Sequence, residues 1–274
     1  MRFVLSLPLP RTRTAAMTAA ALLLIMPVAG QAPAYKAPRT ADGKPNLNGI
    51  WQVLNTANWD LQGHAAQAGL VVEMGAIGAV PAGLGVVEGN EIPYRPEAAA
   101  KKKENFANRL TLDPEIKCYM PGVPRATYMP LPFQIVQTPT VILMAYEFAG
   151  ATRTIYMNNP GDSPVDSWMG WSKGRWEGDT LVVDVNGFND QSWFDRAGDF
   201  HSDALHVVER YTPISANALN YEATIEDAKV FTRPWKISMP LYRHLEKSAQ
   251  LMEFKCVEFV EELLYGKYRK QPGK

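Results

Sequence analysis

From Cys118 onward the chain alternates between short apolar segments and turn residues. Runs of about four to eight residues in which apolar and polar positions alternate, bounded by Gly, Pro, Asn or Asp, are typical of β-strands. No amphipathic helical pattern separates them, and because parallel strands need long crossover connections, the spacing favours antiparallel pairing. Strands are predicted at residues 133–137, 141–148, 152–157, 166–175, 180–186, 205–212, 219–225, 230–238 and 249–256.

Two connections between these segments are short enough for hairpins. Residues 177–179 (EGD) join the strands predicted at 166–175 and 180–186, and residues 213–218 join those at 205–212 and 219–225. Alternation within 205–212 places Glu209 and Tyr211 on the face opposite His206 and Arg210. So many sequential strands favour a meandering barrel or a sandwich.

The N-terminal part of the chain has a different pattern. Residues 36–48 are polar and contain two prolines, which predicts a tether leading into a first strand at 49–54. Residues 58–94 are rich in Ala and Gly, and we expect one short helix near 61–70 followed by an irregular excursion. Helices are predicted at 96–110, with Pro96 at the first position, and at 257–268.

Residues 1–34 combine Arg2, Arg11 and Arg13 with an apolar run from 15 to 28 and an Ala-Pro-Ala end. These features are typical of a secretory signal peptide, and the apolar run is shorter than the roughly 20 residues of a membrane-spanning helix. We expect cleavage after Gly30 or Ala34 and a periplasmic or secreted protein, with an uncleaved membrane anchor as the alternative. The predicted parts are the signal peptide at 1–34, a strand, excursion and helix at 35–117, and the barrel domain with its closing helix at 118–274.

The 274-residue chain carries 28 Lys plus Arg and 28 Asp plus Glu, so its formal net charge is zero. Residues 1–34 contribute three of the basic groups and no acidic one, which leaves 25 against 28 and a formal charge of −3 in the remainder. Because nucleic-acid binding usually needs a basic face, the charge disfavours such a partner. We expect a small-molecule ligand or substrate, and no membrane partner after signal cleavage.

Cys118 and Cys256 are the two cysteines of the chain. In an oxidising compartment they form a candidate disulfide, whose long loop would stabilise the fold by roughly 4 to 5 kcal/mol in the chain-entropy model. Two buried free thiols are the alternative, because sequence separation does not show that the Cα atoms approach within the roughly 7 Å that a bridge requires. Neither cysteine has a nearby His or Cys at ligand spacing, which disfavours a metal site.

Polar and charged residues are densest between 186 and 210, across a predicted loop and the strand that follows it. A histidine oriented by a carboxylate moves protons near neutral pH, because the ordinary imidazole pKa is about 6.5. We therefore predict His201 as the acid or base, with Asp203 or Asp195 as its orienting partner. Arg210 or Arg153 is predicted to stabilise an anion.

Other interpretations of this segment stay open. His201, Asp203 and His206 carry metal-ligand groups, but two positions five apart on a strand face opposite sides, so we expect no metal and no other cofactor. Ser192 or Ser202 would be a nucleophile, although neither lies in a G-x-S-x-G elbow. Turn and cross-strand roles explain the same Asp, Asn and Arg residues without any chemistry.

Tryptophans are candidates for the wall of a ligand cavity. Trp168, Trp171 and Trp193 lie in or beside predicted strands, and an indole ring offers both apolar surface and an N–H donor. With Arg153 and His206 they make up the predicted ligand-binding residues. Packing in a barrel core is the simpler interpretation of any single tryptophan.

Three motifs carry a resemblance: GRWEGDTLVV at 174–183, GFND at 187–190 and HSDALHVVERY at 201–211. Through them the chain resembles a large group of exported bacterial proteins of undefined function. Arg125 within 121–125, and residues 231–235, belong to the same resemblance, which covers most of the chain after residue 34 and implies no established reaction. Residues 49–51 (GIW) are similar to the first-strand motif of lipocalin-type barrels, which implies a ligand-holding barrel without assigning a site.

These patterns predict a mainly β protein with an antiparallel calycin- or lipocalin-like barrel, an irregular N-terminal excursion and a C-terminal helix. The leading expectation is an exported enzyme that acts on a small, partly apolar organic molecule in the barrel cavity by His/carboxylate acid-base chemistry of the isomerase, lyase or hydrolase type. A non-catalytic carrier of a hydrophobic small molecule is the alternative. A cell-envelope interaction module with an exposed aromatic patch is a third possibility.

Overall fold

The computed structural model describes residues 35–69, 75–76 and 79–268. The predicted signal peptide at 1–34 lies outside these residues. Among the helices that the structure describes, we find none with the length and hydrophobicity needed to cross a membrane.

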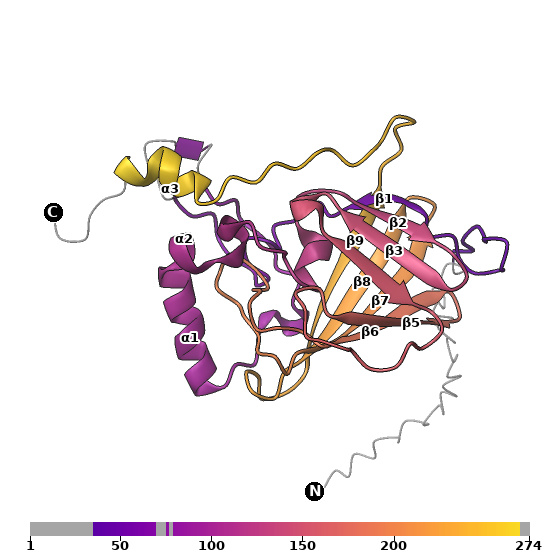
Figure 1. The fold of residues 1–274 in the computed structure, drawn as a ribbon. Helices are drawn as coiled ribbons and strands as arrows, with labels where there is room; N and C mark the ends of the chain where they lie inside the picture. Colours follow the sequence, from indigo (N-terminus) through magenta and orange to yellow (C-terminus); the bar gives the residue numbers. More distant parts are fainter. Residues whose placement is uncertain (1–34, 70–74, 77–78, 269–274) are drawn as a thin grey trace, which may run out of the picture. The chain divides into compact units, whose positions relative to one another are not determined.

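In the described part of the chain, nine strands form one closed barrel (Figure 1). Each strand pairs with its neighbour in sequence, and the last pairs with the first. The strands are β1 (Gly49–Gln52), β2 (Phe133–Gln137), β3 (Val141–Tyr146), β4 (Thr152–Tyr156), β5 (Trp171–Glu177), β6 (Thr180–Asn186), β7 (His206–Ser215), β8 (Ala218–Glu226) and β9 (Trp235–Arg243). The mainly β barrel expected from the alternating pattern is confirmed.

One strand pair differs from the antiparallel expectation. β4 and β5 run parallel, with Ile155 opposite Ser172, whereas the other strand pairs of the barrel are antiparallel. Residues 157–170 connect the two strands, and a connection of this length can return the chain to the end where β4 began. Sequence spacing does not distinguish this crossover from a long hairpin loop.

The predicted hairpins are present. β5 and β6 pair as far as Glu177 opposite Thr180, so Gly178 and Asp179 form a two-residue turn. Gly178 has φ +59°, a backbone conformation that glycine adopts without steric cost. β7 and β8 pair as far as Ser215 opposite Ala218.

The barrel interior is filled by side chains that alternate along the strands. On β7, buried Val207, Glu209 and Tyr211 alternate with half-buried neighbours. The same alternation on β8 and β9 buries one residue in two, and the buried rows meet in a single hydrophobic core. Period-two burial places Glu209 inside and Arg210 outside. The sequence predicts that the two lie on opposite faces, and the structure shows which face is the interior.

Two elements predicted from the sequence are absent from the described residues. Residues 249–256 form no strand, because β1 already pairs with β9 and the closed barrel leaves no edge for another strand. This segment instead contacts the end of β3, where the Met252 N–H donates to Glu147 at 2.8 Å and Phe254 packs on Phe148. The described part of 61–70 contains no helix, since its backbone forms isolated bridges to residues 80 and 83.

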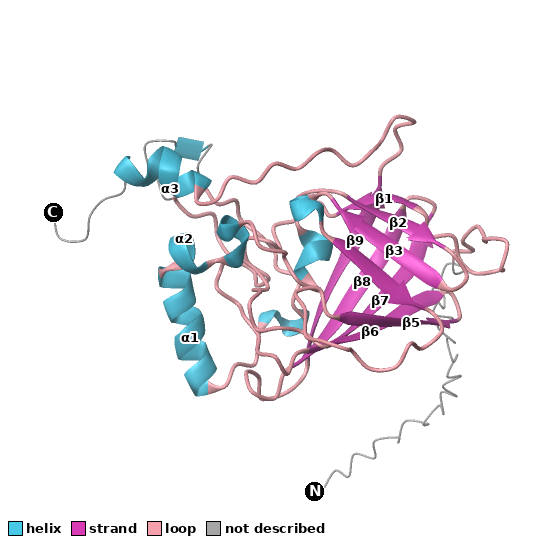
Figure 2. Cartoon of the chain, in the orientation of Figure 1, coloured by secondary structure: helices cyan, strands magenta, loops and turns pink. Residues whose placement is uncertain are grey.

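The helices lie beside the barrel (Figure 2). The predicted helix at 96–110 is present as two segments and starts at Pro96, whose missing N–H costs nothing at a first helical position. The C-terminal helix begins three residues later than expected. The α-helices are α1 (Pro96–Ala107), α2 (Arg109–Leu112) and α3 (Val260–Tyr265); the 3₁₀ helices are η2 (Glu88–Asn90), η3 (Pro114–Lys117), η4 (Arg125–Tyr128), η5 (Phe148–Gly150) and η6 (Gly266–Tyr268).

Candidate functional site

A short backbone bridge in the loop between β6 and β7 brings Ser192 and His201 together. Trp193 and Phe200 form an isolated antiparallel bridge, so the next residues outward, Ser192 and His201, stand opposite each other. The Ser192 Oγ and the His201 Nε2 are 2.8 Å apart, and both residues are buried. Ser192 and His201, which are nine residues apart in sequence, are thus within hydrogen-bond distance of each other.

The hydrogen bonds of His201 define its tautomer. Nδ1 lies 2.8 Å from the backbone carbonyl of Ser202, and since a carbonyl only accepts, Nδ1 carries the proton. In a neutral imidazole Nε2 is then an acceptor, so the Ser192 hydroxyl donates to it. This is the arrangement in which a histidine can remove the proton of a serine hydroxyl.

Asp227, just after β8, holds Ser202, the residue whose carbonyl orients His201. Its carboxylate accepts from the Ser202 N–H at 2.6 Å and from the Ser202 hydroxyl at 3.0 Å. It also accepts from the Lys229 N–H, which closes a tight turn. Asp227 therefore positions His201 through the backbone of Ser202 without touching the imidazole.

Burial controls the protonation of His201. Loss of hydration lowers the pKa of His201 below its ordinary value, although the bond to Ser202 and the charges of Asp227 and Asp190 act in the opposite direction. The rings of Phe188 and Phe194 lie 5.9 and 5.3 Å from the imidazole centre. The imidazole is therefore held in its neutral form near neutral pH.

Asp195, one of the two predicted partners of His201, has a different role. Its carboxylate accepts from the backbone N–H groups of Leu61, Ala197 and Asp199, at 2.9 to 3.1 Å. These bonds fold the loop between Trp193 and Phe200 onto the N-terminal excursion. Asp195 thereby shapes the loop that carries Ser192, while the carbonyl of Ser202 orients His201.

Asp195 also belongs to an acidic cluster with half-buried Asp60 and buried Asp199, whose carboxylate oxygens lie within 4.8 Å of one another. Burial, followed by the charge of Asp199, raises the pKa of Asp195 well above its ordinary value. Asp199 accepts from Tyr94 and pairs with the Lys102 ammonium at 2.9 Å. Since that ammonium already supplies a positive charge, we assign this cluster no metal.

The segment after Cys118 covers Ser192. Gly122 has φ +73°, and a Cβ atom at this position would overlap the Ser192 Oγ, so only glycine fits there. Ser192 is 2% exposed, whereas Tyr119 and Met120 in the covering segment are 43% and 42% exposed. Because Ser192 is buried against Gly122, a molecule reaches its hydroxyl only after a neighbouring part of the chain moves.

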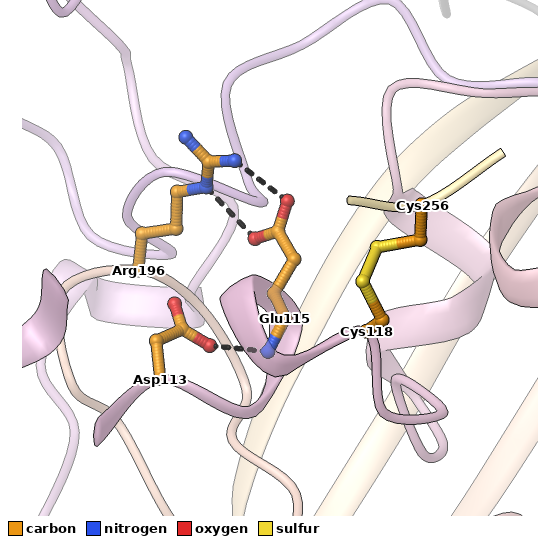
Figure 3. The surroundings of a disulfide bond; sticks show 5 residues. All are labelled: Asp113, Glu115, Cys118, Arg196 and Cys256. Carbon is orange, nitrogen blue, oxygen red and sulfur yellow. Dashed lines mark hydrogen bonds and ion pairs between the residues drawn. A yellow bond between two sulfur atoms is a disulfide. The ribbon is translucent and has the colours of Figure 1, made fainter. Parts of the chain in front are cut away.

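The predicted Cys118–Cys256 disulfide is present, with Cα atoms 5.8 Å apart (Figure 3). It links the start of the covering segment to the chain before α3. Close by, Glu115 accepts from Arg196 at 2.7 and 2.8 Å and from buried Arg125 at 2.6 Å. Burial opposes ionisation of Glu115, but the two guanidinium groups outweigh it and lower its pKa.

An apolar pocket of about 340 Å³ lies beside the disulfide. None of its lining residues is on a barrel strand. Its walls include Ile116, Leu131, Phe148, Phe254 and Val260. This pocket lies outside the barrel, whereas the sequence predicts a ligand cavity inside it.

The barrel interior holds Arg153, which the sequence predicts as an anion-stabilising residue. Its guanidinium is paired with the Glu209 carboxylate and donates to the Ser172 hydroxyl at 2.9 Å. Tyr211 and Tyr221 donate to the same carboxylate at 3.0 and 2.8 Å. Burial alone would lower the pKa of Arg153, but the Glu209 charge raises it well above the ordinary value. The positive charge of Arg153 is therefore already matched within the chain.

Comparison with known proteins adds no family to this geometry. No protein-family model, curated protein or solved structure matches the chain.

The other predicted catalytic residues lie away from the Ser192–His201 pair. Asp203 is exposed and pairs with Lys229. Arg210, on the outer face of β7, pairs with Glu177 at 2.9 Å. The structure thus brings His201 together with neither Asp203 nor Arg210.

The predicted ligand-binding residues are dispersed as well. His206 lies on the outer face of β7, 3.1 Å from Asp184. Trp171 packs on Tyr156 and donates to a backbone carbonyl. Trp168 and Trp193 lie nearer the pair: the Trp168 carbonyl adjoins Gly122, and Trp193 directly follows Ser192.

Sequence reasoning missed two residues of the site. Gly122 lies in a Pro-Gly-Val-Pro run that reads as an ordinary turn, and Asp227 follows a strand where turn-forming aspartates are common. Nothing in the spacing links either residue to His201. The sequence offers Ser192 and Ser202 as candidate nucleophiles, and the bridge between Trp193 and Phe200 brings Ser192 to His201.

Proposed function

We propose that the protein is a hydrolase-type enzyme that cleaves a small, partly apolar ester, with Ser192 as nucleophile and His201 as general base. The observation that carries the proposal is the 2.8 Å contact between the Ser192 Oγ and the unprotonated Nε2 of His201. A serine hydroxyl is a weak nucleophile until an adjacent base takes its proton. The lowered pKa of His201 keeps that base unprotonated near neutral pH.

The reaction proceeds in two steps. Ser192 Oγ attacks the carbonyl carbon while its proton passes to His201 Nε2, and His201 then gives this proton to the departing alcohol oxygen. Water attacks the resulting acyl-serine and loses a proton to His201, which returns it to Ser192 Oγ as the acid leaves. Throughout, the Ser202 carbonyl holds Nδ1–H and stabilises the positive imidazolium.

The surroundings of the pair support an apolar substrate. Phe188 and Phe194 flank the imidazole, and Trp193 is 8% exposed beside Ser192. Apolar walls with a few fixed polar groups are typical of small-molecule sites. Binding requires displacement of the segment that carries Gly122, so the substrate enters through a cover made by residues 119–122.

A fluorophosphonate probe tests the nucleophile directly, because it phosphonylates a serine only where a neighbouring base activates the hydroxyl. We expect mass spectrometry to find the label on Ser192 in the wild-type protein. Ser192→Ala should remove the label, and His201→Gln should slow labelling by about 10²- to 10⁴-fold, the usual contribution of a general base.

Ser248→Ala is the matched control, since Ser248 is exposed in a turn after β9. It should label at the wild-type rate. Thermal unfolding of each variant separates loss of chemistry from loss of fold. A wild-type protein that stays unlabelled at Ser192, or labels equally fast with Gln at position 201, contradicts the proposal.

A second candidate function is a non-catalytic carrier of a hydrophobic small molecule, supported by the apolar pocket of about 340 Å³ beside the disulfide. Binding of an apolar fluorescent probe that Leu131→Trp blocks, together with an unreactive Ser192, favours this candidate over the hydrolase. Export is part of both proposals. The N-terminal Arg-rich and apolar pattern supports it, and so does the disulfide, since such bonds persist mainly in oxidising compartments.

A further inference from the structure

Arg243 is the last residue of β9, and its guanidinium group is held by a tryptophan ring and two backbone carbonyls. Its carbon lies 4.1 Å from the ring centre of Trp51, which is fully buried. Nη1 donates to the carbonyl of Asn48, and Nε donates to the carbonyl of Ala216 at 3.3 Å. Glycine at position 49 leaves room for the guanidinium of Arg243, because a Cβ there would overlap Nη1.

Arg243 has no acidic partner among the residues that the structure describes. The buried Arg125 and Arg153 each pair with a carboxylate, whereas the bonds of Arg243 go to neutral backbone carbonyls. Partial burial lowers the pKa of Arg243, and the opposing influence comes from Tyr35 rather than from a carboxylate. A half-buried cation without a counter-ion attracts an anion, because the surrounding protein has reduced its hydration.

A pocket of about 200 Å³ opens beside this guanidinium. Its polar lining groups are Tyr35, Asn46 and Ser215, each of which carries a hydrogen-bond donor. Among the described residues, no acidic one lines it. Apolar side chains such as Pro38, Pro213 and Leu219 form the remaining wall. The lining thus combines one uncompensated positive charge with a small apolar surface.

We propose that this pocket binds a small organic carboxylate, with the carboxylate on Arg243 and a short apolar body against the proline and leucine wall. A guanidinium pairs with a planar carboxylate through charge-assisted hydrogen bonds, which are stronger than neutral ones. One unmatched positive charge fits a monoanion better than a phosphate. The volume suits a molecule no larger than a single ring. The site is independent of the Ser192–His201 chemistry.

Benzoate and benzamide form a matched pair of probes, because they share shape and differ in charge. The indole N–H of Trp51 donates to the Leu47 carbonyl beneath Arg243, so its NMR signal reports on the pocket. We expect benzoate, titrated at constant ionic strength with chloride, to shift this signal saturably. Benzamide and chloride should leave it unchanged. A benzamide shift of equal size, or no saturable benzoate shift, overturns the proposal.

Ser215→Asp places a carboxylate in the lining while Arg243 stays in position. It should neutralise the site and weaken benzoate binding by about tenfold or more, a difference of about 1.4 kcal/mol. Ser248→Asp adds the same charge at an exposed turn and should bind benzoate like the wild type. Arg243→Gln should abolish binding, and the Ser215 variant keeps the test valid if that substitution unfolds the barrel end. Equal affinity in the Ser215 and Ser248 variants contradicts the site.

Discussion

Arg153 and Glu209 form an ion pair inside the barrel, and both side chains are shielded from solvent. Arg153 lies on β4 and Glu209 on β7, strands that are not neighbours in the barrel. Tyrosine and serine hydroxyl groups complete the hydrogen bonding of the pair. Such a pair tolerates loss of both charges better than loss of one, since a single remaining charge is buried without compensation.

We therefore expect Glu209→Leu to lower the free energy of unfolding by about 3 to 5 kcal/mol. The double variant Arg153→Met/Glu209→Leu should recover a large part of that loss, because no charge is left inside the barrel. Urea unfolding of the wild type, both single variants and the double variant forms the cycle that measures this coupling. Additive losses in the double variant would show that the two groups do not compensate each other.

The reactivity of Ser192 should depend on pH through His201. Because burial lowers the pKa of His201, the neutral imidazole persists below the ordinary value of about 6.5. The labelling rate with a fluorophosphonate should be constant above that value and fall as the pH drops, with a midpoint below 6.5. Rates measured across the range at constant ionic strength give the midpoint. A midpoint above 6.5 would mean that His201 is not the buried base.

The lowered pKa of His201 also makes the stability of the fold depend on pH. His201 has a lower pKa in the folded than in the unfolded chain, so below about pH 6.5 the unfolded chain binds the proton more readily. The stability linked to His201 is therefore fully present above that pH and is lost as the pH falls through the folded pKa. His201→Gln should flatten this part of the stability profile.

The disulfide should restrain the cover over Ser192. Cys118 directly precedes the covering segment and is bonded to Cys256, 138 residues away. Cys118→Ser/Cys256→Ser should lower the free energy of unfolding by about 4 to 5 kcal/mol in the chain-entropy model. Below its unfolding temperature, the variant should label faster at Ser192, because the covering segment loses one anchor. Slower labelling in a folded variant would indicate that the disulfide organises the site instead of covering it.

Local pattern predicts most of the barrel and little of the site. β2 and β6 have the predicted bounds because alternation and flanking turn residues define them locally. The same alternation puts Glu209 on the face opposite Arg210, without showing which face is the interior. It does not reveal Arg153 as the partner of Glu209, because that contact depends on the closure of the barrel. The strand predicted at 249–256 fails for the same reason, since only the β1–β9 pairing shows that no edge remains.

The Ser192–His201 pair depends on similarly non-local features. His201 stands out in the sequence as a histidine among aspartates, and acidic neighbours such as Asp203 are the natural partners to expect. On the folded chain, the backbone carbonyl of Ser202 orients the imidazole, and Asp227, 25 residues further on, holds Ser202 by accepting from its N–H and hydroxyl. A backbone group has no sequence signature, so spacing alone does not identify this partner.

The acidic cluster predicts a pH dependence of stability opposite to the one predicted for His201. Burial and the adjacent Asp199 raise the pKa of Asp195, so the folded chain keeps a proton that the unfolded chain releases above about pH 3.8. The stability linked to Asp195 is present at low pH and is lost as the pH rises towards the folded pKa. The wild-type protein should therefore lose stability over this interval.

Asp199→Asn removes a negative charge that helps to raise the pKa of Asp195. At low pH the variant should be less stable than the wild type, because Lys102 loses the carboxylate 2.9 Å away. As the pH rises the deficit should shrink, because in the variant the charge of Asp199 no longer opposes ionisation of Asp195 and only that of Asp60 remains. Urea unfolding from about pH 4 to pH 8 measures the difference between the two proteins, and Asp162→Asn, at a fully exposed position, is the matched control. A deficit that stays constant across this range would show that Asp199 does not hold the proton on Asp195.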